Sequence, residues 1–117
     1  MSDSVSISRL RFEFKQFRAD GCICGSMNLR ALAAIADAVA MEGGQNRLAA
    51  FLLSSILYDI AEKQDDRPVQ SDEIAAVWKR LGQPVIRCVD LLLGVEHDSA
   101  GIIGDVLDAY FEIREII

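Results

Sequence analysis

An apolar run extends from Leu48 to Ala61, interrupted only by Ser54, Ser55 and Asp59. Hydrophobic residues occupy almost every side of this run at helical spacing, which is typical of a helix buried on most of its circumference. The run is too short to span a bilayer, because a transmembrane helix needs about 20 apolar residues. In a chain of 117 residues it therefore predicts the central helix of one globular domain.

Residues 9–18 show a different pattern, in which Leu10, Phe12 and Phe14 alternate with charged residues. A period of two is typical of a strand with one buried face. A helix that buries Leu10, Phe14 and Phe17 also fits this segment, but it leaves Phe12 outside the apolar stripe. We therefore favour the strand.

The next residues can complete a β-hairpin. Gly21 can take a positive φ in a turn after the first strand. Residues 22–24 can then run back as a short partner strand. The pattern predicts a hairpin over residues 9–25.

The rest of the chain, residues 28–117, has helical patterns separated by turn residues. Ser26 or Asn28 can cap the first helix, Gly43-Gly44 ends it, Ser71 can cap a later helix, and Pro84 fits the first turn of another. The expected helices cover residues 29–41, about 46–61, 72–81, 84–93 and about 100–117. The sequence thus predicts a mainly α single domain over residues 1–117, with about five helices around the central one and a short N-terminal hairpin.

Charge and composition exclude several classes of function. Eighteen acidic and twelve basic residues give a net charge of −6, which disfavours binding to nucleic acid or anionic lipid. The excess acid lies after residue 58. The three cysteines form no disulfide pattern, and the N-terminus lacks the features of a secretory signal. We therefore expect a cytoplasmic protein.

The residues that could carry chemistry form no recognisable set. Cys22, Cys24, Cys88 and His97 could supply a Cys3His zinc site, but their spacing is not that of a known zinc motif. Free cysteines more often act as small core residues. We predict no catalytic residue, no metal and no cofactor, and hence a protein that is not an enzyme.

Residues 71–93 look like a helix-turn-helix around Gly82. Trp78, however, stands where such a motif needs a small residue, and the second helix offers only Arg87 and Asp90 for contacts with bases. A small DNA-binding regulator is therefore an alternative that the sequence supports weakly.

Apolar residues at both ends of the sequence suggest contact with another protein. One face of a hairpin is too small for the rings of Phe12, Phe14 and Phe17, and the chain finishes in Ile116 and Ile117. Such residues either pack on the core or serve a partner. We take Phe12, Phe14, Ile116 and Ile117 as candidate protein-contact residues.

The order of elements resembles the tail assembly chaperones of lambda-like long-tailed bacteriophages. The resemblance covers about residues 10–95: a hairpin, a helix, the apolar helix in NRLAAFLLSSILYDIAEK, a polar loop, and SDEIAAVWKRLGQPVIRCVDLLLGV. It implies a small, mainly helical, non-enzymatic chaperone. It also implies a location in the cytoplasm of the bacterial host and absence from the mature virion.

The resemblance further implies partners. Such chaperones bind the tape measure protein, help to recruit subunits of the major tail tube protein, and are often also made as a longer, frameshifted form. Self-association along the tape measure protein is a further expectation, and nucleic acid and membranes are not expected partners. A structural oligomeric adaptor of the phage particle is the other alternative.

Overall fold

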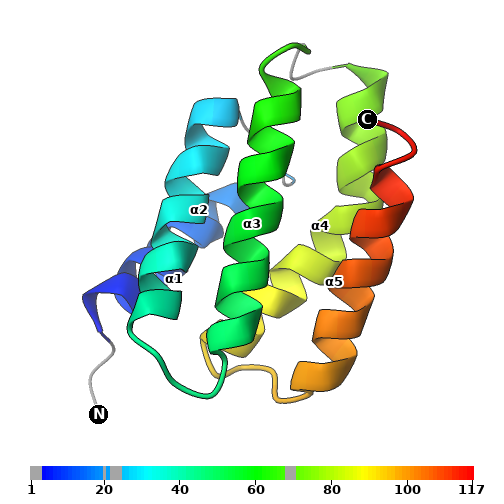
Figure 1. Ribbon diagram of the computed structural model, residues 1–117. Helices are drawn as coiled ribbons and strands as arrows, with labels where there is room; N and C mark the ends of the chain where they lie inside the picture. Colours follow the sequence, from blue (N-terminus) through cyan, green and yellow to red (C-terminus); the bar gives the residue numbers. More distant parts are fainter. Residues whose placement is uncertain (1–3, 20, 22–24, 68–70) are drawn as a thin grey trace.

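The computed structural model describes residues 4–19, 21, 25–67 and 71–117, and every regular element among them is a helix (Figure 1). The prediction of a mainly α protein is thus confirmed. The predicted hairpin over residues 9–25 is wrong, because its first strand is part of a helix. The helices are α1 (Val5–Ala19), α2 (Ser26–Met41), α3 (Arg47–Gln64), α4 (Asp72–Leu92) and α5 (Ser99–Ile113).

Residues 5–19 bury the side chains at helical spacing, and not the alternating side chains on which the strand prediction depended. Leu10, Phe14 and Phe17 are all buried, whereas the side chain of Phe12 is 73% exposed. Ser4 caps the helix, since its Oγ accepts a hydrogen bond from the amide of Ile7 at 3.1 Å. The expected partner strand, residues 22–24, lies outside the described residues.

The aromatic residues of α1 make contacts that a strand over residues 9–18 would lose. The rings of Phe14 and Phe17 pack edge-on with centroids 5.5 Å apart, and Phe17 packs in the same manner against Trp78 of α4 at 5.4 Å. Such pairs stabilise a core beyond simple burial. A strand would direct Phe12 inward and Phe17 outward, and would lose these contacts.

α2 and α3 form a hairpin of helices joined at Gly43 and Gly44, whose φ angles are +84° and +97°. The predicted helix end at these glycines is confirmed. α4 contacts α1, α3 and α5, and α3, which holds the apolar run, contacts α2, α4 and α5, so the run shares the centre of the domain with α4. The outer side of α3 is not covered, however, because Leu48 is 67% and Tyr58 is 43% exposed.

α4 joins two segments that we predicted as separate helices, 72–81 and 84–93. The predicted cap at Ser71 is confirmed, since its Oγ accepts a bond from the amide of Ile74 at 3.2 Å. Pro84 lies inside the helix, where it removes one backbone hydrogen bond, and α4 changes direction in its middle (Figure 1). The helix continues because its buried residues keep one register on both sides of the proline: Ile74, Val77, Trp78, Leu81, Val85, Cys88, Val89 and Leu92.

α5 runs back along α4 and completes an elongated molecule with principal extents of 43 × 26 × 22 Å. Asp98 caps α5 by accepting a bond from the amide of Gly101 at 3.1 Å. The helix ends at Ile113, earlier than predicted, and the chain continues in a turn. Among the described residues, no helix combines the length and the apolarity that crossing a membrane requires.

Candidate protein-interaction site

A groove of about 220 Å³ lies between α1 and the second half of α4. Its apolar lining residues are buried or half-buried: Phe14, Ile86, Val89 and Leu93. Its charged lining residues stand nearer the solvent: Arg11, Lys15, Arg18 and Asp90. The groove thus has an apolar floor and, along α1, a basic edge. We call it the α1–α4 groove.

The spacing of the lining residues fixes the shape of the groove. α1 contributes positions 11, 14, 15 and 18, α4 contributes positions 86, 89 and 90, and position 93 directly follows α4. Each set follows one side of a helix for two turns, or about 10 Å. The groove is therefore a channel between two helices and not an isolated pit.

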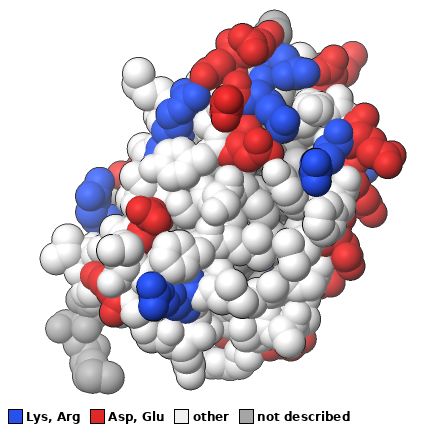
Figure 2. All heavy atoms as spheres, viewed as in Figure 1, with Lys and Arg blue, Asp and Glu red and all other residues white. Residues whose placement is uncertain are grey.

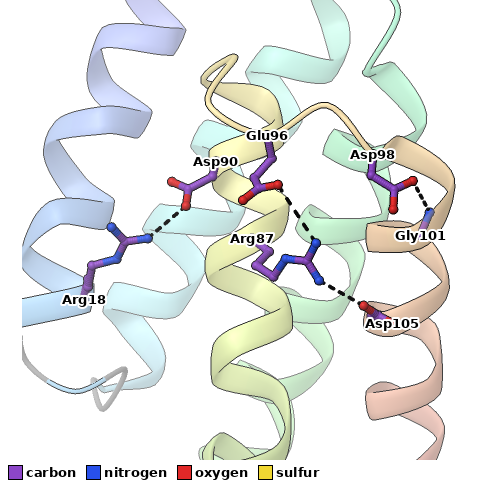
Figure 3. Close-up of polar contacts among 7 residues, drawn as sticks. All are labelled: Arg18, Arg87, Asp90, Glu96, Asp98, Gly101 and Asp105. Atoms are coloured by element: carbon purple, nitrogen blue, oxygen red, sulfur yellow. Dashed lines mark hydrogen bonds and ion pairs between the residues drawn. The ribbon is translucent and has the colours of Figure 1, made fainter.

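An ion pair joins the two walls of the groove. Arg18 Nη2 of α1 lies 3.2 Å from Asp90 Oδ2 of α4 (Figure 3). The backbone carbonyl of Asp90 also accepts hydrogen bonds from the amides of Val95 and Glu96, at 2.8 Å and 3.2 Å. Asp90 is thus held by the chain that leaves α4, and it holds Arg18 in turn.

The opposite side of α4 is attached to α5 by a second set of charges. Arg87 Nη1 lies 3.1 Å from Asp105 Oδ2, and Arg87 Nη2 lies 4.0 Å from Glu96 Oε2. In Figure 3 Asp90 faces Arg18 of α1 on one side of α4, and Arg87 reaches Asp105 of α5 on the other. Exposed ion pairs contribute only about 0–1 kcal/mol each, so the buried apolar residues of α4, more than these charges, hold the helix in place.

Large hydrophobic side chains also remain on the surface. Figure 2 shows a broad uncharged area in the middle of one face, with charged side chains gathered at its margins. The exposed large hydrophobic residues of the described chain are Val5, Phe12, Met27, Met41, Leu48, Tyr58, Val95 and Phe111. Contiguous apolar patches are typical of sites of protein contact, whereas single exposed hydrophobic side chains are common on any protein surface.

The four contact residues predicted from the sequence lie in two separate places. Phe12 is exposed on α1, one turn before Lys15, and Phe14 is buried in the floor of the α1–α4 groove. Ile116 and Ile117 follow α5 and are half-buried against the core. The described parts of α1 and α5 do not contact each other, so these residues form no single surface.

The structure gives no support to a zinc or nucleophilic site. The Cys88 thiol is fully buried and donates to the carbonyl of Ala49 at 3.7 Å, and burial raises its pKa to about 12. A metal ligand or nucleophile must be a thiolate, which this environment disfavours. His97 is exposed in a loop, and Cys22 and Cys24 lie outside the described residues. Within the described chain, no three His, Cys, Asp or Glu residues are placed to hold a metal.

The pKa values of Asp65 and Tyr110 are shifted, and each of these residues has a partner on another part of the chain. Arg30 of α2 binds the Asp65 carboxylate through both terminal nitrogens, at 3.1 Å and 2.5 Å, and this bond lowers the pKa of Asp65 to about 2. Tyr110 of α5 donates to Asp59 of α3 at 2.6 Å. Burial, followed by this bond, raises the Tyr110 pKa to about 12. Both contacts join neighbouring helices.

The groove was not predicted from the sequence, because residues 9–18 were interpreted as a strand. Arg11, Lys15 and Arg18 recur at helical spacing, i, i+4 and i+7, which is the signal that a helical interpretation would have used. The pairing of α1 with α4 has no comparable signal. Comparisons with protein-family models, curated proteins and solved structures found no match for this chain.

Proposed function

We propose that this protein is a non-enzymatic tail assembly chaperone of a lambda-like long-tailed phage, which binds the tape measure protein and helps to recruit tube subunits. The observation that carries the proposal is the apolar surface that the fold leaves uncovered. Phe12, Leu48 and Phe111 are each more than half exposed, and they lie on three different helices. A chaperone needs such surface in order to cover the apolar side of its partner.

The charge of the protein fits the same role. A net charge of −6 keeps a chain with exposed hydrophobic residues soluble through mutual repulsion. Binding a helical protein along its length needs surface and solubility, and it needs no reactive side chain.

The fold agrees with only part of the resemblance to this family. Its N-terminal hairpin is absent, since α1 occupies residues 5–19. A helix followed by the apolar helix is present as α2 and α3, whereas the short helix and the helix beginning near Pro84 in the resemblance form one helix, α4. The part of the resemblance that supports the proposal is the order of α2 and the apolar α3.

Co-expression tests the proposal directly. A tape measure protein from a lambda-like phage genome that encodes this chain is produced with and without it, and the soluble fraction is compared by size-exclusion chromatography with light scattering. We expect the tape measure protein to be soluble and to elute with this chain only when both are present. A tape measure protein that is soluble and monodisperse alone would contradict the proposal.

A DNA-binding regulator fits the structure less well. α4 is continuous from Asp72 to Leu92, so residues 71–93 lack the turn on which a helix-turn-helix depends. An electrophoretic mobility shift at low salt distinguishes the two functions, because tight and sequence-dependent binding of DNA would favour the regulator. Mass spectrometry of purified virions distinguishes a chaperone from an adaptor that stays in the particle.

A further inference from the structure

We propose that the α1–α4 groove binds an acidic amphipathic helix of a partner protein. Apolar side chains of that helix enter the floor, and its carboxylates face Arg11 and Lys15. The proposal rests on the proposed function for the source of the helix, which is the tape measure protein. It adds the place of contact and the chemistry of the segment that binds.

The size of the groove favours a protein side chain over a small molecule. Pockets for drug-sized ligands enclose about 300–1,000 Å³. The groove has about 220 Å³ and is open along one side. This volume suits a few aliphatic side chains that project from a larger body outside the groove.

The spacing of the walls favours a helix. The floor residues Ile86, Val89 and Leu93 follow one side of α4, and Phe14 faces them from α1. A third helix can lay a ridge of residues i, i+3 or i+4, and i+7 along such a channel. An extended peptide has no sheet edge to join, because the described chain has no strands.

The charge at the groove favours an acidic partner. α1 carries four basic residues and one acidic residue, in a chain whose net charge is −6. Lys15 is exposed and forms no ion pair with another described residue. Since the rest of the chain is acidic, a negatively charged helix is attracted to this edge and repelled elsewhere, which gives the contact its position and direction.

The recessed floor argues against a lipid surface as the partner. A membrane binds a helix through apolar residues that project from it. Here Phe14 and Val89 are 5% and 4% exposed and lie below the basic edge. Phe12 is exposed on α1 beyond Lys15, where it can contact the side of a docked helix.

The probe is a fluorescein-labelled designed peptide of 18 residues, helical, with leucines at i, i+3, i+4 and i+7 and glutamates beside them. Fluorescence anisotropy measures its binding to the wild-type protein and to Lys15→Glu. The matched control is Lys79→Glu, which makes the same charge change at an exposed position of α4 that does not line the groove. Circular dichroism checks that each variant is folded.

We expect Lys15→Glu to weaken binding of the acidic peptide about fivefold and Lys79→Glu to change it less than twofold, since an exposed ion pair is worth up to about a factor of five. A peptide with lysines in place of the glutamates should prefer the Lys15→Glu variant. A peptide with serines in place of the leucines should bind at least about tenfold more weakly, because it has nothing to place in the apolar floor.

Three results would overturn the groove as the binding site: no binding of the acidic peptide, equal weakening by Lys15→Glu and Lys79→Glu, or full binding of the serine peptide. Sedimentation with phosphatidylglycerol vesicles measures whether the protein binds an anionic lipid surface instead. Binding to vesicles that Lys15→Glu abolishes, without binding of the peptide, would assign the basic edge to lipid and overturn the proposal.

The co-expression experiment separates this inference from the proposed function. If Lys15→Glu keeps the tape measure protein soluble as well as the wild type does, the groove is not the contact, although the function stands. If the wild type does not affect the tape measure protein but the peptide still binds in a manner that depends on Lys15, the groove stands and the proposed function fails.

Discussion

The α2–α3 pair and the α1–α4 pair bury their contacts with side chains of different size. The fully buried alanines of α2 and α3 are Ala33, Ala36, Ala40, Ala49, Ala50 and Ala61. α1 and α4 meet through large residues that include Phe14, Phe17 and Trp78. Since the distance between two packed helices depends on the side chains at their contact, small residues allow a close approach and large ones hold the helices apart. The groove lies beside the large residues.

Enlarging one residue in each pair tests this difference, and it should give the largest effect. Ala36→Leu adds three carbons where no space is left, so we expect the free energy of unfolding to fall by about 1–3 kcal/mol. Val89→Leu adds one carbon at a residue that lines the groove, and we expect a change within about 0.5 kcal/mol. Urea denaturation followed by circular dichroism measures both.

The comparison fails if Ala36→Leu is tolerated as well as Val89→Leu. Leu48→Ala provides a control for substitution in a helix, because Leu48 is 67% exposed on α3. It should change stability by no more than about 0.5 kcal/mol.

Alkaline pH tests whether the tightly packed region extends from α3 to α4. Burial raises the pKa of the Cys88 thiol from 9.0 to about 12, so the folded state favours the neutral thiol. The associated stability is complete below pH 9 and is lost as the pH rises from 9 towards 12. We expect the free energy of unfolding to fall by about 1 kcal/mol between pH 8 and pH 10 because of this group.

The Cys88→Ala variant isolates that contribution, because Tyr110 and all other titrating groups are present in both proteins. Urea denaturation at pH 8 and pH 10 should show a smaller fall in stability for the variant. An equal fall in both proteins would mean that Cys88 is accessible to water, and the close packing of α3 on α4 would then be wrong.

Two glycines of α5, Gly101 and Gly104, should give the smallest changes in stability. A Cβ on Gly101 would lie 2.2 Å from Asp98 Oδ2, the carboxylate that caps α5, so alanine must displace the cap. A Cβ on Gly104 would have no neighbour within 4 Å. We expect Gly101→Ala to lower stability by about 0.5 kcal/mol, the cap loss exceeding the helix gain, and Gly104→Ala to raise it by about 0.5 kcal/mol.

Thermal unfolding of the two alanine variants side by side measures this difference. Both substitutions replace glycine by alanine in the same helix, so intrinsic helix propensity is nearly the same in each. An equal rise in stability for both would show that Asp98 does not cap α5.

The sequence was sufficient for the helices whose apolar pattern has one interpretation. The run from Leu48 to Ala61 and the boundaries at Gly43-Gly44 and Ser71 agree with the structure. Residues 9–18 fit two periods, and the choice depended on Phe12, whose exposure on a helix is cheaper than the loss of Phe17 from the core. The exposure of Phe12 was a poor reason to prefer the strand, because a single exposed hydrophobic residue is common on protein surfaces.

The α1–α4 groove could not be derived from local pattern. It depends on which helices become neighbours and on α4 continuing through Pro84, and we expected α4 to be divided there. The basic residues at 11, 15 and 18 form a visible set only when the segment is helical. In the sequence, Ile86 and Val89 of α4 have the pattern of ordinary core residues, and only the position of α1 shows that they line a groove.

The bend at Pro84 sets the direction of the α4 wall of the groove (Figure 1). The half of α4 before the proline packs in the aromatic contact of Trp78 with Phe17, and the half after it forms one wall of the groove. A pyrrolidine ring keeps φ near about −65°, a value that a helix already has, so the bend arises from the missing amide hydrogen and from the crowding of the ring against the carbonyl four residues earlier. The wall therefore belongs to a helix whose other half is anchored on α1 by Trp78 and Phe17, so a partner meets a wall that is already ordered.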